Sequence, residues 1–362
     1  MSGTSADAID GVLLKFDDNQ IHIVTHYSQP LSAQTRGRIA TLCTPGGDTL
    51  DLLGSVDAEL GELFAETALK TISKAKLEPT QITAIGSHGQ TVRHRPDASK
   101  EQRRFTLQIG DPNIIAARTG IITAADFRRK DLALGGQGAP LAPAFHARAF
   151  SSAQENRAVV NLGGIANITL LPTTGDVTGF DTGPANTLLD YWCSKHTGQP
   201  FDENGQWAST GSIQQPLLDA LLTHGFLKKD PPKSTGREEF SPQWLETIFE
   251  NFADISVEDV QATLTAFTVE SLSSSLLAVP QAPKRVFVCG GGSYNNYMLS
   301  LLRNKLTGIT VETTDALGID PMQVEGATFG WLAKQTLKRQ HGNLKSVTGA
   351  SRNAILGAIY YP

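Results

Sequence analysis

The sequence predicts an α/β fold built from two related halves. Strand-like and helix-like segments alternate along most of the 362 residues, which is typical of α/β proteins. A chain of this length favours two domains. It also makes two similar openings, each a glycine-bearing turn that leads into an apolar strand, at residues 3–14 and 161–170. Because these openings lie about half a chain apart, we favour two structurally related halves over two unrelated hairpins.

In the first half, residues 12–16, of which four are apolar, predict a strand. Apolar side chains then recur at helical spacing and predict an amphipathic helix over about residues 50–76. Further short strands are expected at residues 82–85, 105–109 and 121–124, followed by a helix at 141–150.

The second half repeats this alternation. A strand at residues 158–162 leads through Gly163-Gly164 into a returning strand at 167–171. A helix is expected over about 184–195, with Pro184 in its first turn, where a missing N–H does no harm. The remaining elements expected are two or three helices within 213–279, a strand at 285–289, helices from about Asn295 and over 321–338, and a last strand near 354–359.

Composition excludes several classes of protein. The formal net charge of −5 argues against a general nucleic-acid binder, which usually carries a basic face. The three cysteines lack metal-ligand spacing and are expected to be reduced. No apolar stretch approaches the roughly 18 residues of a membrane span, and the polar residues 2–10 do not resemble a secretion signal. We therefore expect a cytoplasmic protein without a membrane anchor.

Three glycine-bearing turns offer groups that a bound nucleotide needs. Residues 3–10 (GTSADAID) combine glycine with hydroxyls and carboxylates, which suit phosphate and Mg²⁺. Residues 161–167 (NLGGIAN) and 290–295 (GGGSYN) offer backbone donors, and the latter follows an apolar strand and opens a helix. Each of the first two is also compatible with an ordinary turn. The absence of GxxxxGK[ST] argues against a P-loop, and the G-x-G-x-x-G dinucleotide pattern is not met.

Asp181 lies between glycines in the segment GFDTGPAN, residues 179–186. An aspartate at such a position is either a helix N-cap or a catalytic carboxylate. By itself the segment favours the cap. Together with the turns that suit phosphate, it favours catalysis.

Three further polar residues are candidates for a site. His88 ends an apolar strand, where α/β folds build binding sites, although a loop histidine held by the backbone fits equally well. Arg128 belongs to a charge cluster that is ordinarily a solvated loop, but it precedes a glycine-rich segment and is suited to bind a carboxylate on a sugar. Glu325 is ordinarily a surface or capping residue, and here it is a candidate second carboxylate.

Taken together, these segments resemble the anhydro-N-acetylmuramic acid kinase family along nearly the whole chain. The matching segments, in order, are MSGTSADAIDG, GSHGQTVRH, IGDP, DFRRKDLALGGQGAPLAP, NLGGIANIT, GFDTGPANTLLD, CGGGSYNNYML, PMQVEGATFGWLA and VTGASRNAILGAIY. So many segments in one order are far more specific than any single glycine turn.

The resemblance implies a duplicated actin/hexokinase-like (ribonuclease-H-like) fold, with ATP and Mg²⁺ in a cleft between two lobes. The lobes would be residues 1–135, rejoined by the last strand at about 350–362, and residues 136–349. The family opens the internal bridge of 1,6-anhydro-N-acetylmuramic acid with water and phosphorylates O6. The product, N-acetylmuramic acid 6-phosphate, enters peptidoglycan recycling. A homodimer is also implied.

The resemblance also implies roles for individual residues. Asp181 would be the base that activates water, and Glu325 would assist at the sugar. Residues expected at ATP are Gly3, Thr4, Ser5, Ala6, Asp7, Ala8, Ile9, Asp10, Gly163, Gly164, Gly290, Gly291, Gly292 and Asn295, with Asp7 also at the metal. Residues expected at the sugar are His88, Gln90, Arg128 and Asn167.

The chain departs from the family pattern at two places. Ala8 replaces the usual glycine after Asp7, and it would be strained if its φ were positive. The family also has an apolar strand before MSGTS, so we expect that a few native residues precede Met1. An intact mass of the native protein that matched a start at Met1 would contradict this.

Two rival functions stay open from the sequence. One is another kinase of the same superfamily, acting on a hexosamine or a small carboxylic acid. The other is a non-catalytic, nucleotide-dependent switch or assembly protein, which would turn ATP over slowly and without response to sugar.

Overall fold

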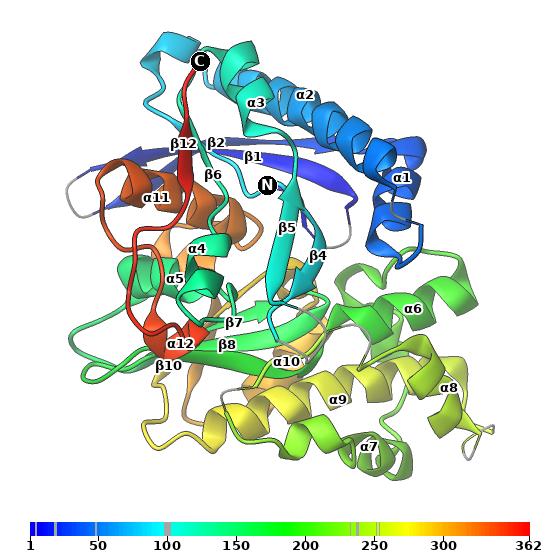
Figure 1. Cartoon of the computed structure of the whole chain (residues 1–362). Coiled ribbons are helices and arrows are strands. Elements are labelled where there is room, and N and C mark those ends of the chain that lie inside the picture. The colour runs from blue at the N-terminus through cyan, green and yellow to red at the C-terminus, as the bar shows by residue number, and fades with distance from the viewer. Residues whose placement is uncertain are drawn as a thin grey trace. The chain divides into compact units, whose positions relative to one another are not determined.

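The computed structural model describes residues 1–3, 6–17, 20–47, 49–97, 103–231, 233–236, 239–250, 252 and 254–362. Helices and strands alternate through them, which confirms the predicted α/β class (Figure 1). They group into two compact units, Met1–Phe145 with Gln323–Pro362, and His146–Met322. Residues 136–145 and 323–349, which the sequence analysis placed in the second lobe, thus group with the first unit.

The second unit is built on a five-stranded sheet with the order β11-β10-β7-β8-β9. β7 lies at its centre, antiparallel to β8 and parallel to β10. β9 is antiparallel to β8, and β11 is parallel to β10. The strands are β7 (Arg157–Leu162), β8 (Ile165–Leu171), β9 (Thr178–Pro184), β10 (Arg285–Cys289) and β11 (Thr310–Thr313).

Helices connect and cover these strands. They are α6 (Asn186–Thr197), α7 (Gln215–Leu222), α8 (Pro242–Phe249), α9 (Val257–Leu277) and α10 (Asn296–Lys305). α9 is buried on most of its surface, and its side chains pack with those of α6, α7 and the sheet in one apolar core. Ser256 caps α9 by accepting a hydrogen bond from Asp259 N.

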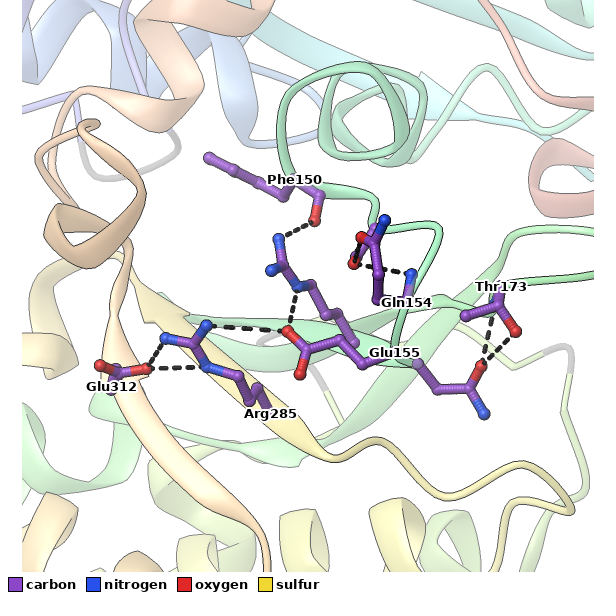
Figure 2. Close-up of polar contacts among 9 residues, drawn as sticks. Phe150, Gln154, Glu155, Thr173, Arg285 and Glu312 are labelled. Atoms are coloured by element: carbon purple, nitrogen blue, oxygen red, sulfur yellow. Dashed lines mark hydrogen bonds and ion pairs between the residues drawn. The ribbon is translucent and has the colours of Figure 1, made fainter.

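Ion pairs occupy the starting ends of the parallel strands (Figure 2). Arg285, the first residue of β10, pairs with Glu312 of β11 and lies 3.6 Å from Glu155. Arg157, the first residue of β7, donates to Glu155 at 2.8 Å and to Phe150 O at 3.1 Å. Charged pairs therefore occupy this end of the sheet, and the glycine turns follow the opposite ends of β7 and β10.

The first unit holds shorter sheets. β1 (Ala8–Phe16) and β2 (Ile21–Pro30) form an antiparallel hairpin. β3 (Ile85–Gly86) is parallel to β6 (Thr123–Ala125), and β12 (Ala358–Tyr360) adds to β6 in the antiparallel direction. β4 (Gln90–Arg95) and β5 (Phe105–Ile109) form a separate antiparallel pair.

The helices of the first unit are α1 (Ala33–Cys43), α2 (Leu50–Lys74), α3 (Pro112–Thr119), α4 (Arg129–Ala133), α11 (Val324–Leu337) and α12 (Lys345–Thr348). The sequence division between the units, after Phe145, falls within α5 (Ala142–Phe150). Figure 1 shows α2 lying along β1 and β2. α2 buries Val56, Leu60 and Phe64 in an apolar cluster with Ile9 of β1. The amphipathic helix predicted at 50–76 is thereby confirmed.

Several predicted boundaries were wrong for local reasons. Pro184 is the last residue of β9 rather than a first-turn helix residue, and α6 begins at Asn186. The strand expected at 82–85 is Ile85–Gly86, because only these two residues pair with β6. The last strand is Ala358–Tyr360 rather than 354–359. The strands expected at 105–109 and 285–289 are confirmed.

The positive φ that was considered for Ala8 occurs at another alanine. Ala8 is the first residue of β1 and is not among the residues with positive φ. Ala6, two residues earlier and buried, has φ of 51°. Among the described residues of this segment, the left-handed conformation therefore occurs at Ala6, before Asp7.

Candidate active site

Asp181 lies in β9, and its carboxylate is held by a neighbouring segment of the second unit. Its Oδ2 accepts hydrogen bonds from Ser234 Oγ at 3.0 Å and Thr235 N at 2.9 Å. Asp181 N donates to Lys233 O at 3.0 Å. Among the described residues, no hydrogen bond is made to Oδ1. The helix-cap alternative is therefore wrong, because the N-cap of α6 is Ala185.

Burial raises the pKa of Asp181, and the hydrogen bonds from Thr235 and Ser234 act in the opposite direction. A carboxylate with a raised pKa is a better proton acceptor, provided that the pH lies above that pKa. Asp181 thus combines a fixed orientation, an uncommitted oxygen and raised basicity. These are properties that a general base needs.

A row of polar side chains crosses three strands of the same sheet. Asn161 of β7 pairs with Asn167 of β8, and Asn167 pairs with Asp181 of β9. Residues that pair directly across antiparallel strands have side chains on the same face. The alternate residues, including Val160 and Ile168, face the apolar core. Asn167, predicted at the sugar, is therefore placed beside Asp181, and Asn161 extends the row.

The two glycine turns of the second unit lie against each other. Gly290 has φ of +80°, and a methyl group on it would lie 2.4 Å from Asn161 Oδ1. A methyl group on Gly292 would lie 2.6 Å from Leu162 Cβ. Only glycine permits this approach of the β10–α10 turn to the end of β7.

The start of α6 is hydrogen-bonded to the turn at Gly163–Gly164 and lies close to the second turn, since a methyl group on Gly292 would lie 3.1 Å from Asn186 Oδ1. Asn186 N donates to Gly163 O at 3.0 Å, and Asn186 Nδ2 donates to Leu162 O at 3.0 Å. Ala185 N donates to Gly164 O at 2.9 Å. The structure therefore gathers the two glycine turns beside the start of α6, where the N–H groups of Ala185, Asn186 and Thr187 are already bonded to the carbonyl groups of Gly163 and Gly164.

Asn295 has a structural task. Its Oδ1 accepts a hydrogen bond from Met298 N at 2.9 Å and caps α10. The side-chain oxygen is thus committed to the helix, and any contribution of Asn295 to a nucleotide would come from its other groups.

In the first unit, the half-buried Arg128 contacts the buried His88. Arg128 Nη2 lies 2.9 Å and Nε 3.2 Å from His88 Nε2, and Arg128 Nη1 donates to Gly138 O at 2.8 Å. Because a guanidinium can only donate, Nε2 must accept, which makes the imidazole neutral with its proton on Nδ1. Burial, reinforced by Arg128, lowers the pKa of His88 well below its ordinary value.

Gln90 and Glu325 complete the predicted set in this unit. Gln90 is buried, and its Oε1 accepts a hydrogen bond from Ser2 Oγ at 2.6 Å. The Glu325 side chain is exposed to solvent, although many protein atoms surround it. These atoms reduce the hydration of the carboxylate and so raise its pKa, whereas Arg128 and the N-terminal amine lower its pKa. The ring of Phe329 lies 4.5 Å from that of His88.

The first glycine turn is described only in part. Thr4 and Ser5 lie outside the described residues, and Gly3 O accepts from Ala6 N at 3.1 Å. Ile9 is fully buried, and Asp10 is exposed. Asp7 is largely exposed, and its carboxylate lies 3.7 Å from Arg36 Nη1.

Among the described residues, no group of three or more His, Cys, Asp or Glu side chains is placed to hold a metal ion. A magnesium ion in a kinase does not need such a group, because one or two carboxylates and the phosphates suffice. The exposed carboxylate of Asp7 fits this requirement.

Sequence reasoning missed Lys233, Ser234 and Thr235. They lie far from Asp181 in the sequence, in a segment without strand or helix periodicity. The available signal was the segment DPPKSTGREE at residues 230–239. In it, two hydroxyl side chains lie between a lysine and a glycine, with prolines before them and acidic residues after them. Such a cluster is common in surface loops, and only the fold shows that it contacts β9.

Comparison with known proteins identifies the family that this chain resembles. The family model described as anhydro-N-acetylmuramic acid kinase matches residues 1–362. A relative with that name from Shewanella halifaxensis is 47% identical over 361 residues, covering 99% of this chain and 97% of the relative. Another from Saccharophagus degradans is 46% identical over 364 residues, covering 100% and 98%.

Solved structures give weaker likenesses. A hexokinase from Thermus thermophilus matches with 15% identity and a TM-score of 0.30, covering 88% of this chain and 97% of that one. A dehydratase component from Acidaminococcus fermentans matches with 10% identity and a TM-score of 0.41, covering 89% and 95%. Scores this low carry no argument about the site. The match of the family model and the relatives together show that this chain belongs to the anhydro-N-acetylmuramic acid kinase family.

Proposed function

We propose that this kinase uses ATP, Mg²⁺ and water to convert 1,6-anhydro-N-acetylmuramic acid into N-acetylmuramic acid 6-phosphate and ADP. The observation that carries the proposal is the Asp181 carboxylate, fixed through Oδ2 with Oδ1 uncommitted. Within the kinase family, this geometry distinguishes a water-activating base from a carboxylate that only caps a helix.

Asp181 takes a proton from water while the water oxygen attacks the anomeric carbon of the sugar. The bond between that carbon and O6 breaks, and its electron pair stays on O6. O6 then attacks the γ-phosphorus of ATP, and ADP leaves. Burial supports the first step because it raises the pKa of Asp181, and the hydrogen bonds from Ser234 and Thr235 hold the carboxylate in place.

In the first unit, Arg128 is suited to bind the carboxylate of the substrate's lactyl group. Three of its five N–H donors are directed to His88 and Gly138, which leaves donors for a ligand. The neutral His88 holds the guanidinium without adding a positive charge. We assign Gln90 and Asn167 to hydroxyl or amide groups of the sugar, and Glu325 to assistance at the sugar.

The glycine turns would hold the nucleotide. Backbone N–H groups of the turns at Gly163–Gly164 and Gly290–Gly292 would supply donors to phosphate or adenosine. The turn at residues 3–10 would supply further donors, and Asp7 would hold Mg²⁺. The ion, when bound, neutralises charge on the transferred phosphoryl group.

A homodimer and a cytoplasmic location remain part of the proposal. The relatives are kinases by name. No helix among the described residues combines the length and apolarity that a membrane crossing requires. Sedimentation of the purified protein would test for the dimer.

The test uses mass spectrometry of the products formed from ATP, the anhydro sugar and ¹⁸O-labelled water. We expect one labelled oxygen at C1 and an unlabelled phosphate at O6. Unlabelled C1, or no phosphorylated product from this sugar, would contradict the proposal. Phosphorylation of N-acetylglucosamine instead would favour another sugar kinase, and slow ATP turnover unaffected by any sugar would favour a nucleotide switch.

The matched variant is Asp181→Asn. An amide oxygen can still accept from Ser234 and Thr235, so the fold and ATP affinity should be retained. An amide cannot take a proton, so turnover of the anhydro sugar should fall by about 10²–10⁴-fold, the usual contribution of a general base. Near-normal turnover would remove Asp181 from this role.

A further inference from the structure

The free edge of β9 is covered by a short segment of irregular chain. In the part of the chain that the structure describes, β9 is an outer strand of its sheet, so this edge needs partners from outside the sheet. Asp181 N–H donates across it to Lys233 O at 3.0 Å. The same segment, residues 233–235, supplies both donors to the Asp181 carboxylate, Ser234 Oγ and Thr235 N. The geometry of Asp181 therefore depends on what holds this segment in place.

The segment has few other contacts that could fix it. Residues 233–235 are neither helix nor strand, Ser234 is exposed, and Thr235 is only partly buried. Among the described residues, the backbone of this segment and the side chains of Ser234 and Thr235 make no hydrogen bond except those with Asp181. The side chain of Lys233 is therefore the remaining anchor of the segment.

The Lys233 ammonium is held by η4, a 3₁₀ helix at Gly225–Lys228. Its Nζ donates to Leu227 O at 3.1 Å and to Phe226 O at 3.5 Å. The same Nζ lies 5.0 Å from the centre of the Phe226 ring, within the range of a cation–π contact. The half-buried Lys233 thus directs its donors at the backbone of η4.

η4 is a firm support for this side chain. Phe226 is buried, and its ring packs edge-on against the buried ring of Phe240, with the ring centres 5.7 Å apart. Leu227 lies against β9, since a methyl group on Gly183 would lie 3.3 Å from Leu227 Cδ2. η4 therefore touches β9 two residues beyond Asp181.

These contacts form a closed circuit within the second unit. It runs from Asp181 N–H to Lys233 O, and from Lys233 Nζ to Leu227 O. The Leu227 side chain then returns to β9 at Gly183. Because Asp181 and Gly183 belong to one strand, the circuit fixes residues 233–235 relative to the carboxylate.

We propose that Lys233 is a positioning residue for the catalytic base, an assignment that rests on the proposed role of Asp181. The ammonium fixes the backbone from which Ser234 and Thr235 hold Oδ2 of Asp181. Oδ1 is thereby kept in one orientation for the water that the reaction activates.

The charge of Lys233 is not the means of this effect. Burial raises the pKa of Asp181, and the groups that lower it are the neutral donors of Thr235 and Ser234. The Lys233 ammonium is bonded to η4 rather than to the carboxylate. Removing the ammonium should therefore release the partners of Asp181 rather than remove a charge from its side.

The test compares Lys233→Met with Lys229→Met. Methionine keeps an unbranched, flexible side chain but cannot donate a hydrogen bond. Lys229 is a matched control, because its Nζ also lies over the Phe226 ring, at 5.4 Å, but its ammonium is more exposed and pairs with Glu239 at 4.0 Å. A further variant, Lys233→Arg, keeps N–H donors and a cation at the position.

Amide hydrogen exchange, measured without substrate, reports on the segment directly. We expect the amides of Asp181 and Thr235 to exchange roughly tenfold faster in Lys233→Met, and to stay protected in Lys229→Met and Lys233→Arg. The amide of Phe180 should keep its rate in all variants, because alternate residues of β9 face β8. Equal exchange in Lys233→Met and Lys229→Met would overturn the proposal and leave the role of Asp181 untouched.

Steady-state kinetics complete the test. In Lys233→Met, kcat for the anhydro sugar should fall roughly 10–100-fold with the KM for ATP unchanged, whereas Lys229→Met should match the native chain. Native kcat in Lys233→Met, alongside a strongly impaired Asp181→Asn, would overturn the positioning role alone. Near-normal turnover of Asp181→Asn would instead remove the base itself, and the positioning role with it.

Discussion

The buried carboxylate of Asp131 offers a quantitative test of the first unit. This side chain has no exposed surface. Its Oδ1 accepts from Asn343 Nδ2 at 2.6 Å and Thr348 Oγ1 at 2.7 Å, and its Oδ2 accepts from Gly138 N at 2.8 Å. Gly138 belongs to the glycine-rich loop, and its carbonyl group is the one that binds Arg128. Asp131 therefore connects this loop to Asn343 and Thr348, near the end of the chain.

Asp131→Asn keeps the shape but replaces one acceptor by an N–H₂ donor. In either orientation of the amide, that donor meets Gly138 N–H or the Asn343 amide. One buried unsatisfied donor costs about 1–3 kcal/mol, and loss of the charge weakens the remaining hydrogen bonds by about 1 kcal/mol. We therefore expect the free energy of unfolding of this unit to fall by about 2–4 kcal/mol, and its midpoint by roughly 5–12 °C.

Thermal unfolding followed by calorimetry measures this change, with Glu62→Gln as the control. Glu62 pairs with Arg118 on the surface, both side chains being well exposed, so its replacement should change the stability much less than Asp131→Asn does. The losses of stability caused by Thr348→Val and Asp131→Asn should be non-additive in the double variant, because both changes affect the same hydrogen bond between Thr348 and Asp131. A loss no greater than that of the control, or additive effects of the two changes, would refute the reasoning.

Three further variants probe the site. Ser234→Ala removes a hydrogen bond that lowers the pKa of Asp181, so the acid limb of the kcat profile should move to higher pH; an unmoved limb would exclude Asp181 as the titrating base. Gly290→Ala should destabilise the second unit by about 2–4 kcal/mol in urea unfolding, more than Gly308→Ala, which has similar φ but open space; equal losses would contradict the clash. Arg128→Lys should raise the KM for the anhydro sugar about tenfold and leave that for ATP unchanged; the reverse pattern would place this residue at the nucleotide.

The sequence predicted the elements with strong periodicity. The helix at Leu50–Lys74 and the strand at Arg285–Cys289 carry regular apolar patterns that tertiary contacts reinforce. Pro184 was misassigned because a proline suits both a helix start and the end of a strand. The choice depended on β8, which pairs with the strand as far as Pro184.

The candidate site was predictable in its residue types more than in its contacts. Asp181 was identified by its glycine neighbours, but the groups that hold its carboxylate are contributed by a separate loop. Asp131 was not singled out from the sequence, where it directly follows the charge cluster at residues 126–130. Its complete burial follows from contacts with residues more than 200 positions later, as with Thr348. No local pattern reports such contacts.

The discontinuity of the first unit has a consequence for synthesis on the ribosome. The second unit is one continuous stretch, His146–Met322, and all of its strands are available before translation ends. The first unit needs α11, whose Gly326 and Gly330 lie against β1, and these residues are translated after the whole second unit. At about 5–20 residues per second, the nascent β1–β2 hairpin waits roughly 15–60 s for that helix. During this interval its apolar face is open to chaperones, so the order of folding runs from the middle of the chain outward.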